Sequence, residues 1–158
     1  MSDCDAVARP GFDEVRGPML YAILCYNRED VVGAWTPAED AVVMARLGAV
    51  EQGLALAGRL GPVARLLPTT AAVTLRKTRP NGGREAMVID GPFAETKEQL
   101  LGFYVVECEG LEAAIEVARA RAAANPDRGA YEIRPVDVFR PGEPPGVPSL
   151  RRAMGADA

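Results

Sequence analysis

The chain of 158 residues has no histidine, and its few nucleophilic side chains are poorly placed for catalysis. Ser2 and Ser149 are the only serines, and both lie close to the ends. Cys4, Cys25 and Cys108 are far apart in the sequence and form no CxxC pair. A serine or cysteine nucleophile needs an activating base, and zinc or haem sites draw on histidine and cysteine. These absences argue against nucleophilic catalysis and predict a protein without a metal or cofactor.

The chain also lacks a strong charge of one sign and any long apolar run. Lys and Arg number 18 and Asp and Glu 22, so the formal net charge is −4, without the basic excess of a nucleic-acid-binding protein. No apolar run approaches the ~20 residues of a membrane-spanning helix, and residues 1–15 lack the basic and apolar regions of a signal peptide. We therefore expect a cytoplasmic protein that binds neither nucleic acid nor membranes.

The two ends of the chain lack the apolar periodicity of a packed domain. Residues 1–18 show no repeat and end in Arg16-Gly17-Pro18, which indicates a flexible leader. Residues 141–158 are rich in proline and glycine and bury too little apolar surface to offset their ordering entropy, so they predict a flexible tail. One folded domain should then cover residues 19–140.

Between these ends, apolar spacing predicts a defined order of strands and helices. Met19–Tyr26 is a nearly continuous apolar run, which is typical of a buried strand. Thr36-Pro37-Ala38-Glu39 is a capping box that starts a helix, Gly58 ends that helix, and Trp35 before it should act as a hydrophobic staple. The later elements are expected in this order: an edge strand or extended connection at 63–67, a strand at 71–78 with its hairpin partner at 84–89, a strand at 103–108, a helix over 111–122 and a strand at 131–139.

This order predicts an α+β fold of the ferredoxin-like kind, a sandwich with both long helices on one face of a mainly antiparallel sheet. Asn81-Gly82-Gly83 supplies the turn of the hairpin, and Pro135, where the apolar phase of the last strand slips, predicts a bulge or a sheet edge. Cys25 and Cys108 lie in apolar strand patterns and should be core thiols. The opposite sheet face would be left bare, and we expect it to pair with a second copy of the chain in a homodimer.

The stretch from Asp90 to Gly102 breaks the surrounding pattern and admits a structural interpretation. Asp90-Gly91-Pro92-Phe93 leaves a strand sharply, because Asp and Gly favour turns. Thr96 and Gln99 have the spacing of a second capping box, which predicts a short helix that starts at Thr96 and ends at Gly102. Phe93 would then lie against the core.

The same stretch also admits a functional interpretation. The free N–H groups of a helix N-terminus attract anionic groups and Lys97 adds a cation, although Glu95 and Glu98 oppose an anion. Asp90 would act as a general base if burial raised its pKa. The candidate ligand-binding residues are Asp90, Gly91, Phe93, Glu95, Thr96 and Lys97, and the candidate catalytic residue is Asp90.

The run DGPFAETKEQLLGFYVVE, residues 90–107, resembles the signature of the DGPF proteins, a branch of the YCII-related domain family. The similarity extends to Met19–Tyr26, to LALAGRLGP at 54–62 and to YEIRPVDVF at 131–139, and it thus covers residues 19–140. The resemblance implies a dimeric α+β barrel, in which ferredoxin-like domains pair through their sheets. It also implies an uncharacterised bacterial protein, often encoded beside an extracytoplasmic-function sigma factor.

The resemblance leaves the function open. The wider family implies a His–Asp pair in some enzymes and, in one activity, dehydrochlorination of an aromatic diol, but a chain without histidine cannot form that pair. Acid–base chemistry would fall to Asp90, Glu95, Lys97 or a tyrosine. The leading hypothesis is a small cytoplasmic dimer that binds a small organic ligand or serves as an accessory in sigma-factor-linked regulation. The alternative is a lyase or isomerase that uses Asp90 as general base on a small substrate such as an aromatic compound.

Overall fold

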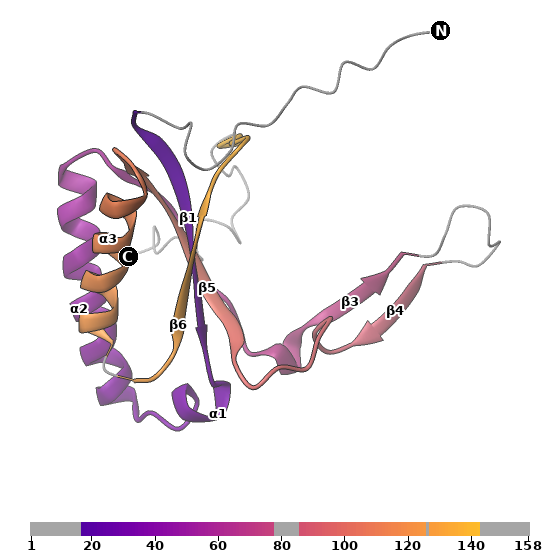
Figure 1. Ribbon diagram of the computed structural model, residues 1–158. Helices are drawn as coiled ribbons and strands as arrows, with labels where there is room; N and C mark the ends of the chain where they lie inside the picture. The colour runs from indigo at the N-terminus through magenta and orange to yellow at the C-terminus, as the bar shows by residue number, and fades with distance from the viewer. Residues whose placement is uncertain (1–16, 78–85, 126, 143–158) are drawn as a thin grey trace, which may run out of the picture.

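The computed structural model describes residues 17–77, 86–125 and 127–142 (Figure 1). The predicted leader and tail lie almost wholly outside this range, as does the hairpin turn at Asn81-Gly82-Gly83. The elements are β1 (Met19–Asn27), α1 (Glu29–Val32), α2 (Pro37–Leu56), β2 (Leu60–Arg65), the 3₁₀ turn η1 (Thr69–Ala71), β3 (Val73–Arg76), β4 (Met87–Asp90), β5 (Gln99–Cys108), α3 (Leu111–Ala124) and β6 (Ala130–Pro135).

Four of the strands form one antiparallel sheet in the order β2-β5-β1-β6, and β3 and β4 form a separate two-stranded sheet. The sheet strands alternate with the helices as β1-α2-β2-β5-α3-β6, and Figure 1 shows α2 and α3 side by side on one face. This is the ferredoxin-like arrangement, so the predicted α+β fold class is confirmed. Pro135 ends β6, an edge strand, which agrees with the edge expected there.

Alternation along the strands decides which side chains enter the core. Tyr21 and Ile23 on β1 and Tyr104 and Val106 on β5 point toward the helices and are nearly inaccessible. They form one cluster with Cys108, Leu54 of α2 and three residues of α3, Ala114, Val117 and Ala118. Cys108 is therefore a core thiol, as predicted, whereas Cys25 is half-buried and packs against this cluster.

The start of α2 follows its sequence signal. The Thr36 hydroxyl accepts a hydrogen bond from the Glu39 N–H at 3.2 Å, and the Glu39 carboxylate accepts one from the Thr36 N–H at 2.8 Å. The predicted staple by Trp35 is wrong, because the residue that would meet it one turn into the helix is Asp40. The indole Nε1 instead donates to the Asp127 carboxylate at 2.7 Å. Within the described ranges, no helix is long and apolar enough to cross a membrane.

A second structural unit, which we call the arm, comprises residues 66–77 and 86–98 and is built on the β3–β4 hairpin. Figure 1 shows it projecting away from the side of the sheet that α2 and α3 leave uncovered. The pairing runs from Val73 opposite Asp90 to Arg76 opposite Met87. Its exposed large apolar side chains are Leu66, Leu67, Val73, Leu75, Met87, Val88, Ile89 and Phe93. The arm thus turns apolar side chains to solvent.

Candidate functional site

The residues predicted as a site lie at the base of the arm. Asp90 ends β4 and is exposed, and the next residue, Gly91, turns the chain with a φ of 95°. The Gly91 N–H donates to the Ala72 carbonyl at 2.8 Å, and the Thr74 hydroxyl donates to the Gly91 carbonyl at 2.8 Å. This turn directs Phe93 outside the sheet, so its predicted core position is wrong: the ring is 72% exposed. The Arg76 guanidinium lies 5.1 Å from its centroid.

The short helix predicted between Thr96 and Gly102 is also wrong. β5 already begins at Gln99 and pairs with β1 from Asn27 onward, so long-range strand pairing overrides the local helix signal. The side chains of the expected capping box do interact, since Gln99 Nε2 donates to the Thr96 carbonyl at 2.6 Å, but they do so in a loop. Gly102 allows close approach of β2 instead of ending a helix, because a Cβ there would collide with the Ala64 carbonyl.

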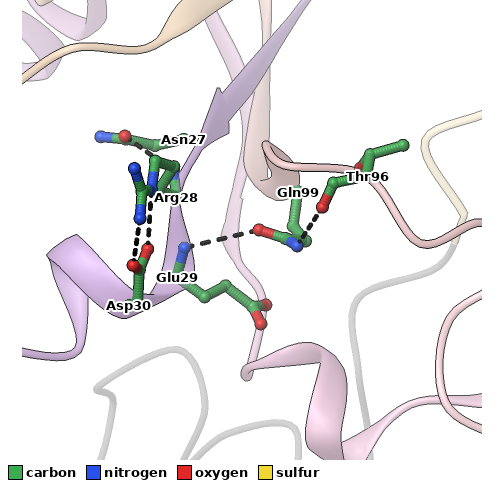
Figure 2. A network of polar contacts seen from close by, with 6 residues as sticks. All are labelled: Asn27, Arg28, Glu29, Asp30, Thr96 and Gln99. Atoms are coloured by element: carbon green, nitrogen blue, oxygen red, sulfur yellow. Dashed lines mark hydrogen bonds and ion pairs between the residues drawn. The ribbon is translucent and has the colours of Figure 1, made fainter.

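Polar contacts tie this loop to the end of β1 (Figure 2). The Glu29 N–H donates to Gln99 Oε1 at 3.4 Å, and Arg28 Nε donates to Asp30 Oδ1 at 3.0 Å. The carboxylate of Glu29 accepts two hydrogen bonds of 2.6 Å from Thr69, one from its N–H and one from its hydroxyl. Glu29 thus connects the main sheet to the start of the arm.

The structure brings only some of the predicted site residues to a hollow. Thr96 and Lys97 line two open surface grooves, one beside Tyr26 and Tyr131 and one beside Arg28 and Glu29. Asp90, Gly91, Phe93 and Glu95 line neither groove. Roles for these residues in binding or catalysis stay predictions.

A different site lies between the sheet and the helices, and we call it the inner cavity. It has a volume of about 180 Å³. The walls come from both helices, from the helix-facing side of the sheet and from the loop before α2. Its polar and aromatic lining residues are Cys25, Asn27, Trp35, Glu51, Tyr104, Arg121, Asp127 and Tyr131, and its aliphatic ones include Val43, Leu47 and Val63. None of the six predicted site residues lines it.

Arg121 of α3 is the central polar residue of the inner cavity. It is only 4% exposed, and its Nη1 donates to Glu51 Oε1 of α2 at 2.8 Å. The guanidinium carbon lies 3.6 Å from the centroid of the Tyr104 ring, a cation–π contact that favours the charged group inside the fold. The Nε–H is fully buried and has no hydrogen-bond partner among the residues that the structure describes. A buried donor without an acceptor is uncommon in folded proteins and costs free energy.

Burial favours the neutral forms of three further cavity residues, Cys25, Tyr104 and Tyr131. Burial raises the pKa of Cys25, and the hydrogen bond with Tyr104 and the charge of Arg121 offset this only in part. Burial also raises the pKa of Tyr104 far above its ordinary value, with a further contribution from Cys25, and it raises the pKa of Tyr131. A neutral thiol is a weak nucleophile. The cavity therefore combines charged side chains that already have partners, neutral hydrogen-bonding groups and apolar walls, an arrangement suited to holding a small molecule.

Sequence reasoning missed this site although a signal was present. Arg121 lies three residues after Ala118 on the inward face of its helix, and Glu51 lies four residues after Leu47 on the inward face of the other. Two residues of opposite charge, each on the inward face of its helix, indicate an ion pair that forms inside the fold. A search restricted to apolar residues overlooks them.

The fold defines the protein as a small ferredoxin-like α+β protein with a hairpin arm inserted between the second and third strands of its main sheet. The family model of the YCII-related domain matches residues 19–140, and the chain belongs to this family. It is 55% identical over 127 residues to an uncharacterised protein of Rhizobium meliloti (strain 1021), across 80% of this chain and 99% of that protein. The predicted family is thus confirmed.

Proposed function

We propose that the protein binds a small organic ligand in the inner cavity. The observation that carries this proposal is the combination of apolar walls with a buried Arg121 whose Nε–H lacks a partner in the described structure. Ligand sites in proteins typically join apolar walls to a few convergent polar groups. An engineered apolar cavity of about 150 Å³ holds benzene, so about 180 Å³ suits a molecule of one ring with a substituent.

A homodimer through the open sheet face is the second part of the proposal. The side chains that alternate with the core residues on β1 and β5 point away from the helices, and they include Leu24 and Phe103, which are paired across the two strands. The apolar arm projects on the same side. A second copy would cover both surfaces, and large exposed apolar patches on small proteins commonly mark such interfaces.

The enzymatic alternative, a lyase or isomerase with Asp90 as general base, has less support. Asp90 is exposed and does not line the inner cavity, whereas a general base must reach a bound substrate within hydrogen-bond distance. Accessory function in a sigma-factor system stays a prediction, since the apolar arm fits a second copy as well as another protein.

Native mass spectrometry of the protein, purified under mild conditions from its own host, tests the proposal. We expect the mass of a dimer and a small molecule that is released on denaturation. Val43→Phe, which places a ring into the cavity wall, should abolish the retained molecule. Val42→Phe on the outer face of the same helix, where the side chain is 50% exposed, is the matched control and should retain it. Equal loss in both variants, or a monomer without ligand in the unmodified protein, would contradict the proposal.

A further inference from the structure

We infer that the ligand of the inner cavity is a small, uncharged, largely apolar molecule whose oxygen accepts a hydrogen bond from Arg121. This inference rests on the proposed function, because it names the chemical class that the same cavity takes.

The N–H donors of Arg121 are the reason why the ligand should carry an oxygen that accepts a hydrogen bond. A guanidinium carries five N–H donors and no acceptor. Glu51 accepts from Nη1 on one side, while the Nε–H has no acceptor among the described residues. The Nε–H is closed off by the surrounding side chains, but Arg121 lines the cavity, and Glu51 engages only Nη1 of its guanidinium. A ligand oxygen would therefore accept from a guanidinium N–H group on the cavity side.

The charged residues of the cavity already have partners, and for this reason we expect an uncharged ligand. Arg121 is already neutralised by Glu51 at 2.8 Å. The other cationic lining residue, Arg65, is paired with Asp40 at 2.8 Å, and the Asp127 carboxylate is occupied by the Trp35 indole. An anionic ligand would add an unmatched negative charge beside Glu51 and lose its own hydration. A carbonyl or ether oxygen adds no net charge.

The walls and the size determine the rest of the class. Tyr104 and Tyr131 keep neutral phenols because burial raises the pKa of both. The remaining lining is largely aliphatic or aromatic, including Val43, Leu47 and Trp35. A volume of about 180 Å³ is sufficient for a substituted ring.

Three probes of equal heavy-atom count separate the possibilities: acetophenone, which has a neutral acceptor, α-methylstyrene, which replaces that oxygen by carbon, and benzoate, which is charged. Calorimetry on the full chain gives the affinities. The single tryptophan of the sequence, Trp35, lines the cavity, so its indole N–H resonance reports whether a probe binds there. We expect acetophenone to bind and shift this resonance, and benzoate to bind at least about 10-fold more weakly.

Arg121→Met should lower the preference for acetophenone over α-methylstyrene by about 10- to 100-fold, because it removes a charged hydrogen-bond donor. Arg119→Met on the exposed face of the same helix is the matched control and should leave the preference unchanged. Comparing the two probes within each variant removes their different tendency to leave water.

If Arg121→Met does not fold, the Arg121 Nε–H resonance of the unmodified protein replaces it: acetophenone should move this signal and α-methylstyrene should not. Tightest binding by benzoate, or an unchanged preference in Arg121→Met, would overturn the ligand class and leave the cavity as a binding site. Failure of all three probes to shift the Trp35 resonance would overturn the class and count against the cavity itself.

Discussion

The main sheet with its two long helices, which we call the body, and the arm are both built on antiparallel strands. The body buries its apolar side chains, whereas the arm exposes them. In the body, Ile23 and Val106 are completely buried between sheet and helices. In the arm, the paired residues Leu75 and Val88 both face solvent, and Val88 is 64% exposed. A two-stranded hairpin is marginal by itself, since it needs further strands or a packed surface. The body thus buries its apolar side chains within itself, whereas those of the arm are left uncovered by the residues that the structure describes.

The largest expected effect is a loss of stability of the body on removal of its buried ion pair. Glu51→Gln leaves the buried guanidinium of Arg121 without its counter-charge, and the free energy of unfolding should fall by about 2–3 kcal/mol. This is at the lower end for a buried pair, because the Glu51 side chain is 26% exposed. Urea denaturation measures the loss. Glu116→Gln, which breaks the exposed pair with Arg119, should change stability by less than about 0.5 kcal/mol. Equal losses of stability in the two variants would contradict the greater contribution expected of the buried pair.

The next effect concerns the arm. Val88→Glu should leave monomer stability within about 0.5 kcal/mol, because its side chain is already exposed, but raise the dissociation constant of the proposed dimer by about 10- to 100-fold. Analytical ultracentrifugation across a dilution series measures this constant. Val42→Glu on the outer face of α2 serves as the control, with an unchanged constant expected. Dissociation by the control variant alone would place the dimer contact on the helices and not on the arm.

A smaller effect concerns the stability of the body at alkaline pH. Burial holds the pKa of Tyr104 far above its ordinary value of 10.0. The unfolded chain therefore releases this proton above about pH 10 while the folded chain retains it, and stability falls as the pH rises. From pH 10 to pH 11 the contribution is about 1 kcal/mol. Tyr104→Phe should show a shallower loss in urea denaturation over this interval and little difference in pH dependence near pH 8. Parallel curves for both proteins would contradict the assignment.

The smallest effect tests a surface pair of the body. A hydrogen bond from Arg65 lowers the pKa of Asp40 below its ordinary value of 3.8 and links α2 to β2. The pair should contribute less than about 1 kcal/mol, since both side chains are partly exposed. This contribution is present above pH 4 and is lost as the pH falls through the lowered pKa. Asp40→Asn should thus be slightly less stable at pH 7, and the difference should shrink as the pH falls below 4, by thermal unfolding; a difference that persists undiminished in acid would rule out the ion pair as its cause.

The fold was predictable because its signals act over short distances. The run Met19–Tyr26 gave a buried strand, and Thr36 with Glu39 formed the expected capping box. The same logic failed at Thr96 and Gln99, where a matching local pattern was overridden by pairing of β5 with β1, a contact between distant parts of the chain. The site could not be predicted from the sequence for a related reason. Arg121 and Glu51 come together only through the packing of two helices, and neither residue is unusual in its own segment.

The strand order of the sheet also has a consequence for how the chain comes into being. β1 pairs with β5 and β6 in the main sheet, and both follow it by a long stretch of chain. During synthesis the apolar run Met19–Tyr26 therefore leaves the ribosome long before its neighbours exist. Non-local pairing of this kind slows folding and prolongs the exposure of apolar segments. β1 therefore cannot complete its sheet pairing until β5 and β6 have been made.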